Sequence, residues 1–314
     1  MMVKIYTCTM NMAIDLFIET PELLPNTVNR TSDDEIQANG KGINVSLILK
    51  QLGIDNTALG FCGGFTGRYI ADFLSQKQIP TDFIEVDGMT RINVFAKVQA
   101  TKDEYKLVNQ GPKIMPEEIK VLLDKIRQLK AGDYLCVSGS LPRGVPEDIL
   151  VEISKICEAK QINLILDTSA KMIYKCLPYH PFLLKPNEQE LGSWFGKENL
   201  TIAECLTCCK QLVAKGAKQV LLSLGGNGGA FVNGKGYILG NSPKGVVVNT
   251  ACAGDTMLAT FLAEQLNQKT EAQALKLSLA AGSSTAFRRG LTDFSDVDQL
   301  LEQIELHEEV FKND

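Results

Sequence analysis

Strand-like and helix-like segments alternate along the chain from Ile54 to Leu224, and this order limits the possible fold more than any other feature. The strand-like segments are short and apolar, whereas the helix-like segments repeat apolar residues at spacings of three and four. A strand–helix–strand order requires a parallel sheet with helices on its faces, because each helix returns the chain to the starting edge of the sheet. We therefore expect an α/β fold with a central, mostly parallel sheet. The expected strands lie within Thr57–Gly67 and at Tyr134–Val137, Leu164–Leu166, Phe182–Leu184 and Gln219–Leu224, with helices at Pro116–Leu129, Ile149–Ala159 and Ile202–Lys215.

Length and composition agree with one large domain that spans residues 1–314. The apolar fraction of 45% supports a large core, and α/β domains of this length occur. The formal net charge of −5 leaves no basic surplus, so we expect no nucleic-acid partner. No apolar run approaches the length of a membrane span, and the first residues lack a signal-peptide pattern, so the expected location is cytoplasmic.

The segment Val246–Leu266 combines a β-branched run, a turn of small residues and a helical pattern. It predicts a strand or extended segment that leads through Thr250–Gly254 into a helix. Small residues at a helix start let a ligand approach free backbone N–H groups, where the helix dipole favours negative charge. Asp255 follows at once, so an anion-binding cup lies beside a candidate general base, as phosphoryl transfer to a hydroxyl requires. The alternative is that Asp255 only caps the helix.

Polar residues at expected strand ends form the rest of the candidate site. The carboxyl ends of parallel strands share one edge of a sheet, so these residues are expected to converge. Each segment alone also fits an ordinary turn or helix start. The four segments are Asp15, Ser138–Leu141, Lys185–Glu190 and Asn249–Asp255.

Three short motifs fit metal, nucleotide or phosphate binding. Asn187 and Glu190 have side chains that hold Mg²⁺, directly or through water, and the alternative is a plain helix N-terminus. The Gly225–Gly229 turn lets a nucleotide approach the backbone, and the alternative is a hairpin turn. Asn39–Gly42 precedes a helix at Ile43–Leu52, and its N–H groups and lysine suit a phosphate or a polyol; the alternative is a surface turn.

Two stretches of β-type sequence stand apart from the strand–helix alternation. Residues from about 16–36 and 90–107 hold strand-like pieces without adjacent helices. They either pair into a small sheet that covers a site as a lid, or they extend the main sheet. The chain then closes with a helix at Glu271–Phe287 and a charged tail that is expected to face solvent.

Nine cysteines in a chain without a secretion signal are expected to be reduced and mostly buried. Only Cys205, Cys208 and Cys209 cluster in sequence. A structural zinc site usually needs four ligands, and the chain offers few histidines and no second Cys-x-x-Cys. Cys205 and Cys209 also fall on the apolar face of the helix Ile202–Lys215, so core packing is their expected role.

Taken together, the motifs resemble those of the ribokinase-like carbohydrate kinases of the PfkB type, over nearly the whole chain. Within that family the chain is most similar to the 1-phosphofructokinases and tagatose-6-phosphate kinases, and two motifs, T-R-I-N-V and S-P-K-G, favour the former. In chain order, the motifs are N-x-A-I-D at Asn11–Asp15, V-N-R at Val28–Arg30, x-G-K-G-x-N at Asn39–Asn44, T-R-I-N-V at Thr90–Val94, S-G-S-L-P at Ser138–Pro142, L-D-T-S at Leu166–Ser169, K-P-N-x-x-E at Lys185–Glu190, S-L-G-x-x-G at Ser223–Gly228, S-P-K-G at Ser242–Gly245 and A-G-D-T at Ala253–Thr256.

The resemblance implies a ribokinase-like fold with a β-sheet lid, the use of ATP and Mg²⁺, and a homodimer formed through the lid. It implies phosphorylation of a ketohexose monophosphate, with fructose 1-phosphate as the first expectation and fructose 1,6-bisphosphate as its product. The alternatives are a tagatose-6-phosphate kinase and a sugar-phosphate-binding regulator without catalysis. A monovalent cation near Asn249 and Ala286 is a further expectation.

The resemblance also implies a role for each matching residue. Asp255 would be the base, and Cys252, Ala253 and Gly254 would form the anion cup. The sugar would be held by Asp15, Gly40, Lys41 and Asn44, its phosphate by Arg91, Ser140, Lys41 and Arg30, ATP by Lys185, Asn187, Ser223, Gly225, Gly228 and Ser284, and Mg²⁺ by Glu190 and Asn187.

Three residues depart from the usual family pattern. Met12 replaces a proline, Asn39 replaces a glycine, and Cys252 replaces the first glycine of the anion cup. A sulfur at Cys252 would narrow the cup or make it oxidisable, so we hypothesise some thiol sensitivity. The backbone N–H groups of the cup remain, and activity is therefore expected.

Overall fold

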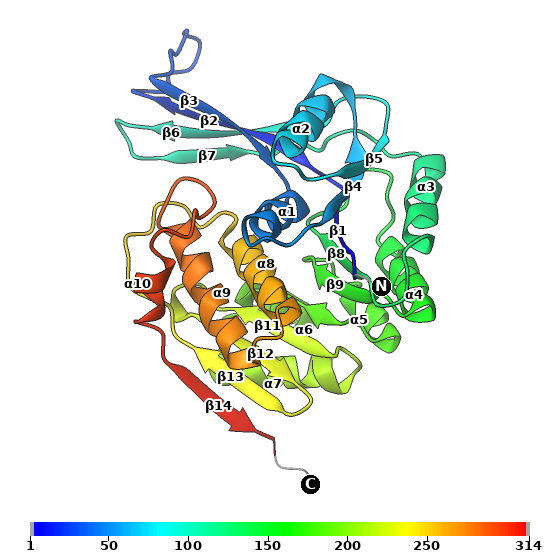
Figure 1. Ribbon diagram of the computed structural model, residues 1–314. Helices are drawn as coiled ribbons and strands as arrows, with labels where there is room; N and C mark the ends of the chain where they lie inside the picture. Colours follow the sequence, from blue (N-terminus) through cyan, green and yellow to red (C-terminus); the bar gives the residue numbers. More distant parts are fainter. Residues whose placement is uncertain (1–2, 312–314) are drawn as a thin grey trace.

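The computed structural model describes residues 3–311 of the chain, which fold around two β-sheets (Figure 1). The strands of the larger sheet, in spatial order, are β14 (Leu306–Val310), β13 (Gly236–Gly240), β12 (Gly229–Asn233), β11 (Gln219–Ser223), β10 (Leu183–Leu184), β9 (Asn163–Asp167), β8 (Tyr134–Ser138), β1 (Ile5–Thr9), β4 (Thr57–Cys62) and β5 (Thr81–Glu85). Pairing is parallel from β11 to β5 and antiparallel from β11 to β14. The strand–helix alternation of the sequence thus predicts the parallel part correctly.

Helices cover both faces of the larger sheet, and each layer has its own apolar core. One layer comprises α1 (Lys41–Gln51), α8 (Ala253–Leu266), α9 (Glu271–Ala286) and α10 (Val297–Leu301). The other comprises α3 (Pro116–Arg127), α4 (Ile149–Lys160), α5 (Ile173–Cys176), α6 (Glu188–Phe195) and α7 (Ile202–Ala214). The helix α2 (Gly64–Gln76) packs with α1 in a third, smaller core. Within residues 3–311, every helix is too short or too polar to cross a membrane.

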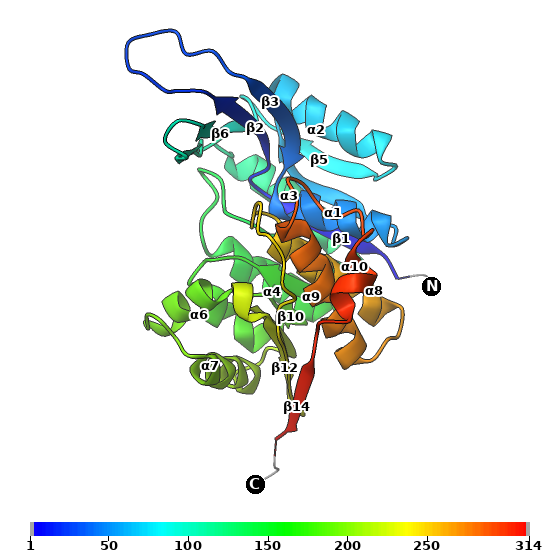
Figure 2. The same ribbon diagram turned by 90° about the vertical axis from the view of Figure 1, so that its left-hand side faces the viewer.

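A second sheet projects from the main body and lies apart from the first (Figure 1). Its strands, in spatial order, are β3 (Asp33–Asn39), β2 (Ala13–Thr20), β6 (Arg91–Val98) and β7 (Glu104–Leu107). The two stretches of β-type sequence therefore form a small separate sheet and do not extend the main one. Ile14 and Ala38 pack the base of this sheet against α2, and the loop between β2 and β3 reaches beyond it (Figure 2).

Asp15 does not end a strand of the larger sheet, so that prediction was wrong. It is the third residue of β2, because the chain turns at residues 10–12 after β1 and enters the second sheet at once. The strand-like alternation of the sequence continues through this short turn. Periodicity alone therefore gives no sign that the chain changes sheets.

Two further segments depart in part from expectation. Of the two forms expected for Val246–Val248, a strand or an extended segment, the structure excludes the strand, and the three side chains are 82%, 60% and 50% exposed. β-branched residues form a strand only where a neighbour supplies hydrogen bonds, and β13 is already paired with β12 and β14. The segment after Phe287 is more ordered than a solvent-facing tail, because α10 buries Val297 and Leu300 and β14 pairs along the sheet edge.

Candidate active site

The start of α8 holds a buried carboxylate close to a buried ammonium group. Asp255 lies in the first turn and is 5% exposed, and Asn44 of α1 donates a hydrogen bond of 2.8 Å to its Oδ2. Cys252 caps the helix in a left-handed conformation with a φ of 64°. A Cβ on Gly254 would lie 2.9 Å from Nζ of Lys185, so a glycine leaves room for this cation. Free N–H groups, the helix dipole and a cation together suit an anion.

Asp167, at the end of β9, links two ammonium groups. Its Oδ1 lies 3.0 Å from Nζ of Lys41 and 3.4 Å from Nζ of Lys185. Nζ of Lys41 also lies 3.6 Å from Oε1 of Glu190. Asp167 is fully buried, and its Oδ2 has no hydrogen-bond partner among the described residues. Buried charges are tolerated only when they are paired, so these groups stabilise one another.

Burial and neighbouring charges set the protonation states of this cluster. Burial raises the pKa of Asp255 to about 6, and the negative charge of Asp167 adds to the rise. Lys41 and the hydrogen bond from Asn44 oppose it. Burial by itself would lower the pKa of Lys41, but Asp167 and Glu190 outweigh burial and raise it. At neutral pH the cluster therefore holds an ionised carboxylate with proton affinity suited to a general base, beside a charged lysine.

Asp15, in the second sheet, has both carboxylate oxygens bonded to amides. Asn93 donates to its Oδ1 at 2.8 Å, and Asn39 donates to its Oδ2 at 2.5 Å. Burial raises the pKa of Asp15, although the two hydrogen bonds and the charge of Arg91 oppose the rise. The carboxylate is thus held in a fixed orientation at the wall of a cavity.

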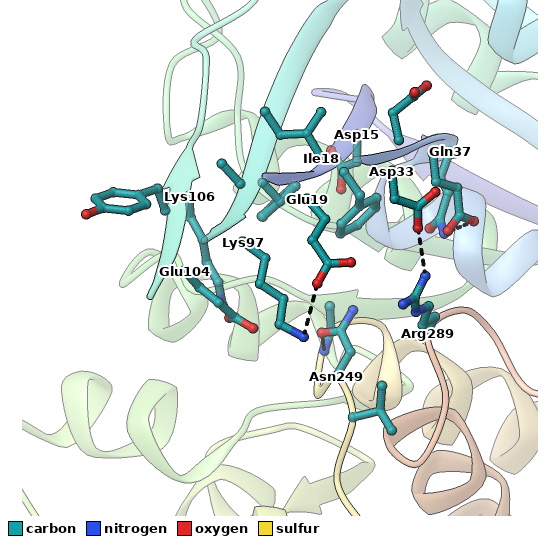
Figure 3. Close-up of a pocket in the computed structure, with 18 residues that line it drawn as sticks. Asp15, Ile18, Glu19, Asp33, Gln37, Lys97, Glu104, Lys106, Asn249 and Arg289 are labelled. Carbon is teal, nitrogen blue, oxygen red and sulfur yellow. Dashed lines mark hydrogen bonds and ion pairs between the residues drawn. The ribbon is translucent and has the colours of Figure 1, made fainter. Parts of the chain in front are cut away.

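This cavity, of about 190 Å³, lies between the second sheet and the larger domain (Figure 3). The sheet contributes Asp15 and Glu19, and the larger domain contributes Asn249 and Arg289. Nη1 of Arg289 lies 3.2 Å from Oδ2 of Asp33, so an ion pair connects the two parts of the molecule (Figure 3). The second sheet therefore covers a cavity beside the carboxylate of Asp15.

Arg91 and Ser140 lie close together, whereas Arg30 lies apart. The guanidinium group of Arg91 donates to the backbone oxygen of Asn11 at 2.9 Å, and the side-chain amide of Asn11 donates to Oγ of Ser140 at 3.2 Å. Arg30 is exposed in the loop between β2 and β3, which extends away from the larger domain (Figure 2). The structure thus groups Arg91 with Ser140 and leaves Arg30 outside.

Asn187 and Glu190 form a capping box at the start of α6. Oδ1 of Asn187 accepts a hydrogen bond of 2.8 Å from the backbone N–H of Glu190, and Oε2 of Glu190 accepts one of 2.9 Å from that of Asn187. The structure therefore shows the helix N-terminus that the sequence offered as the alternative to a metal site. Oε1 of Glu190 is not part of the box and faces Lys41.

Ser223, Gly225 and Gly228 lie where β11 turns into β12. Ser223 ends β11 beside the start of α6, and Gly225 opens a single 3-10 turn. A Cβ on Gly228, which has a φ of 93°, would lie 2.0 Å from a backbone oxygen, so this turn requires glycine. Ser284 is buried in α9, and its hydroxyl is bonded to Thr292 and Asp296.

Two residues contribute to the site although the sequence analysis assigned them no role, namely Asp167 and Asn93; a third, Asn39, was named only as part of a segment and as a departure from the family pattern, with no role for its side chain. Asp167 ends an expected strand, which is the same signal that selected the other candidates. Asn93 faces Asp15 only because β2 and β6 pair in register, and sequence periodicity does not reveal such a pairing.

The cysteines of the molecule are structural or poorly reactive. Cys205 and Cys209 are fully buried in the core under α7, as their spacing predicts.

Within residues 3–311, no group of three or more His, Cys, Asp or Glu side chains could hold a metal ion. Burial raises the pKa of the Cys252 thiol, and the charges of Asp255 and Asp15 add to the rise. Thiolate is therefore scarce at Cys252, which argues against the hypothesised thiol sensitivity.

Comparison with known proteins gives the family. Residues 6–298 match the pfkB family carbohydrate kinase. The chain belongs to the PfkB family of carbohydrate kinases. This PfkB chain is 50% identical to a D-tagatose-1-phosphate kinase of Bacillus licheniformis, over 96% of its own length and 99% of the relative. It is 38% identical to a 1-phosphofructokinase of Bacillus subtilis, over 96% and 99% of the two chains.

The fold of this PfkB chain also matches a solved kinase. Phosphofructokinase-2 from Escherichia coli, crystallised in complex with potassium, superposes with a TM-score of 0.89 at 27% identity, over 96% of this chain and 99% of that one. The predicted ribokinase-like fold, with a large mostly parallel sheet and a small separate sheet, is thus confirmed. Membership of this kinase family implies ATP and Mg²⁺.

Proposed function

We propose that the chain transfers the terminal phosphoryl group of ATP to the free primary hydroxyl of a ketohexose 1-phosphate, which gives the 1,6-bisphosphate. The observation that carries this proposal is the buried carboxylate of Asp255, with its raised pKa, at the start of α8. Family membership supports the kinase reaction, and the names of the two bacterial relatives support a sugar that already carries a phosphate at C1.

In the proposed step, Asp255 accepts the proton of the sugar hydroxyl as the hydroxyl oxygen attacks the terminal phosphorus. The new O–P bond forms while the P–O bond to ADP breaks, and ADP leaves with the electron pair. Backbone N–H groups at residues 252–254 (Cys252, Ala253 and Gly254) stabilise the charge on the transferring group, and Lys185 faces the same position.

The nucleotide is assigned to the edge of the sheet where β11 meets α6. Mg²⁺, when bound, neutralises charge on the nucleotide phosphates. Carboxylate oxygens suit Mg²⁺, and Oε1 of Glu190 lies outside the capping box. We assign Glu190 to the metal, with Asn187 acting through the remaining lone pair of its Oδ1 or through water. ATP is assigned to Lys185, Asn187, Ser223, Gly225 and Gly228. Ser284 is left out of this set, because it is buried and its hydroxyl is already bonded to Thr292 and Asp296.

The sugar phosphate is assigned to the space between Asp15, which lines the cavity, and the start of α1. Asp15, Gly40 and Asn44 are assigned to the hydroxyls of the sugar. A phosphate monoester carries about two negative charges near neutrality, so cations must hold it, and Lys41, Arg91 and Ser140 are assigned to this group. Arg30 joins them only in an assembly that brings its loop to a site.

A homodimer formed through the second sheet is the expected assembly. Apolar side chains of this sheet and its loop are exposed, and a second copy would cover them. Light scattering should give the mass of two chains, and Leu107→Lys should shift the protein to one chain; a wild-type monomer would reject the dimer. The exposed apolar residues are Leu23, Leu24, Val28, Ile36, Tyr105 and Leu107.

A monovalent cation is assigned to the place where the backbone near Asn249 meets Ala286 at the end of α9. The backbone N–H groups of Val248 and Asn249 both donate to the backbone oxygen of Ala286, which brings these two segments together. The potassium complex of the Escherichia coli relative supports this assignment. Turnover in K⁺ should exceed turnover in a bulky organic cation at equal ionic strength, and equal rates would reject it.

The sugar is identified by ADP release with fructose 1-phosphate, tagatose 1-phosphate, tagatose 6-phosphate, fructose 6-phosphate and fructose, for wild type and Asp255→Asn. Fructose 1-phosphate is the expectation from the motifs, and the 50% identical relative favours tagatose 1-phosphate, which differs only at C4. Turnover of either 1-phosphate that is lost in the variant supports the proposal. Turnover of fructose alone would reject the phosphate site at Lys41 and Arg91. Binding of both substrates without turnover would indicate a regulator.

A further inference from the structure

One asparagine at the junction of β3 and α1 bonds to both halves of the candidate site. Asn39 ends β3, and Gly40 follows as the N-cap of α1. Nδ2 of Asn39 donates to Oδ2 of Asp15 at 2.5 Å, and its Oδ1 accepts from Nδ2 of Asn44 at 2.9 Å. Asn44 donates in turn to Oδ2 of Asp255 at 2.8 Å. A continuous chain of hydrogen bonds therefore runs from the second sheet to α8.

The chemistry of the partners fixes the orientation of both amides. An ionised carboxylate only accepts hydrogen bonds, so the Nδ2 groups of Asn39 and Asn44 must face Asp15 and Asp255. The backbone N–H of Gly40 only donates, and it lies 2.6 Å from Oδ1 of Asn39. A flipped amide at either position would bring two acceptors or two donors together. The chain of bonds can therefore form in only one sense.

The amide of Asn44 has more acceptors around it than it has protons. Its two Nδ2 hydrogens face Oδ1 of Asn39, Oδ2 of Asp255 and Sγ of Cys252, the last at 3.1 Å. Without the oxygen of Asn39, the amide loses one of the acceptors that fix its orientation, and its bond to the carboxylate is held less rigidly. The side chain of Asn39 thus determines which acceptors Asn44 serves.

We propose that Asn39 is a positioning residue that fixes the sugar-side carboxylate of Asp15 and the base Asp255 relative to each other. This inference rests on the proposed function, in which these two groups bind the sugar and accept its proton. Asn39 lies where the second sheet joins the larger domain. A displacement of that sheet would therefore be transmitted to Asp255 through the side-chain amides of Asn39 and Asn44. The glycine that is usual at this position of the family motif has no side chain to make these bonds.

The titration of Asp255 can report on this chain of bonds. Its carboxylate also faces the charges of Asp167, Lys41 and Lys185, and the hydrogen bond from Asn44 lowers its pKa. Substitution of Asn39 leaves those three charges in place. A rise in the pKa of Asp255 would therefore follow from the altered bond to Asn44, because burial is the largest cause of its raised pKa and reduced burial would instead lower the pKa.

The test compares Asn39→Ala, Asn39→Ser and a matched control, Asn163→Ala. Asn163 begins β9, at the end of the strand opposite to Asp167 and the candidate site, and its amide donates to the backbone oxygen of Gly132 at 3.2 Å. Asn39→Ala should lower kcat roughly 10- to 100-fold and leave KM for ATP unchanged. Its Asp255 carboxylate, followed by carbon-13 NMR and assigned with Asp255→Asn, should titrate at higher pH. Serine, whose hydroxyl donates and accepts, should restore part of both effects.

Two results would overturn different parts of this account. If Asn39→Ala loses stability like the control but keeps the wild-type kcat, sugar-phosphate KM and Asp255 titration, Asn39 is only structural and the inference is wrong. If wild type turns over none of the sugars, the proposed function fails instead. The NMR titration needs no turnover, so it still decides whether Asn39 controls Asp255.

Discussion

Nζ of Lys41 lies 3.0 Å from Oδ1 of Asp167, so the cation assigned to the substrate phosphate is already held by a buried carboxylate. Lys185 lies 3.4 Å from the same oxygen. One carboxylate therefore orients two cations, and its charge also raises the pKa of Asp255. Sequence motifs assign Lys41 to substrate, and the structure adds that substrate must compete with Asp167 for it.

Asp167→Asn should shift the low-pH limb of the kcat profile, measured at saturating sugar phosphate, to lower pH and reduce the maximal kcat. Removal of the negative charge favours ionised Asp255, so its pKa falls, while two buried ammonium groups lose their partner. Steady-state rates over about pH 5 to 8 measure the shift. Asp133→Asn is the control, because Asp133 is also buried but bonds to backbone N–H groups of Lys4 and Lys130. A limb that stays in place in Asp167→Asn, or moves equally in the control, contradicts the prediction.

The wild-type rate should fall below a pH of about 6, the value to which burial raises the pKa of Asp255. A general base must be ionised, so the rate declines about tenfold for each further unit of pH. The second ionisation of a sugar phosphate also lies near pH 6 and affects kcat/KM. The decline should therefore be measured in kcat at saturating sugar phosphate, and a kcat that is flat down to about pH 5 would exclude Asp255 as the base.

Asp255→Asn should stabilise the fold at neutral pH, and the gain should shrink in acid. The pKa of Asp255 is raised in the folded state, so between about pH 4 and 6 the folded protein binds a proton that the unfolded chain has lost. Acid therefore stabilises wild type through this group, whereas the buried charge costs stability at neutral pH. Thermal unfolding at about pH 8 and pH 5 measures the difference in Tm between variant and wild type. A difference that grows toward low pH would have the wrong sign.

Gly254→Ala should reduce kcat on the order of 100-fold with little loss of stability. Its Cβ would meet Nζ of Lys185 at 2.9 Å and displace the cation that faces the anion cup. Alanine otherwise favours a helix, so α8 itself should tolerate the change. Gly234→Ala is the matched control, because no atom lies within 4 Å of its Cβ position. Equal rates in the two variants would contradict the prediction that the reaction needs Lys185 in its present position beside Gly254.

Periodicity and strand ends were sufficient to predict the parallel sheet and the helix that begins beside Asp255. They also placed Lys185 correctly at the same edge, because a parallel sheet brings its carboxyl ends together. Asp15 was misplaced because its alternating pattern runs on through a turn between two sheets. Val246–Val248 was predicted as a strand or extended segment from composition, which says nothing about whether a neighbouring strand is available.

The hydrogen bonds and ion pairs of the site could not be predicted from sequence. Lys41 and Asp167 are 126 residues apart, and Asn44 and Asp255 are 211 residues apart. Local pattern carries no information on which side chains meet at such separations, since contact depends on the packing of α1 against α8 and on strand order. The hydrogen bonds of Asn39 also join residues that are distant in sequence. The sequence shows only that Asn39 replaces a glycine of the family motif, and the structure is needed to see which groups its amide bonds.

The ion pair of Arg289 and Asp33 joins residues 256 positions apart, and its side chains are 70% and 57% exposed. Such a pair contributes at most about 1 kcal/mol and is weakened by salt, whose screening length is about 8 Å under physiological conditions. It therefore adds only a weak, salt-sensitive link between the second sheet and the larger domain. Rising salt should loosen this link and leave the position of the second sheet to its apolar contacts with the larger domain.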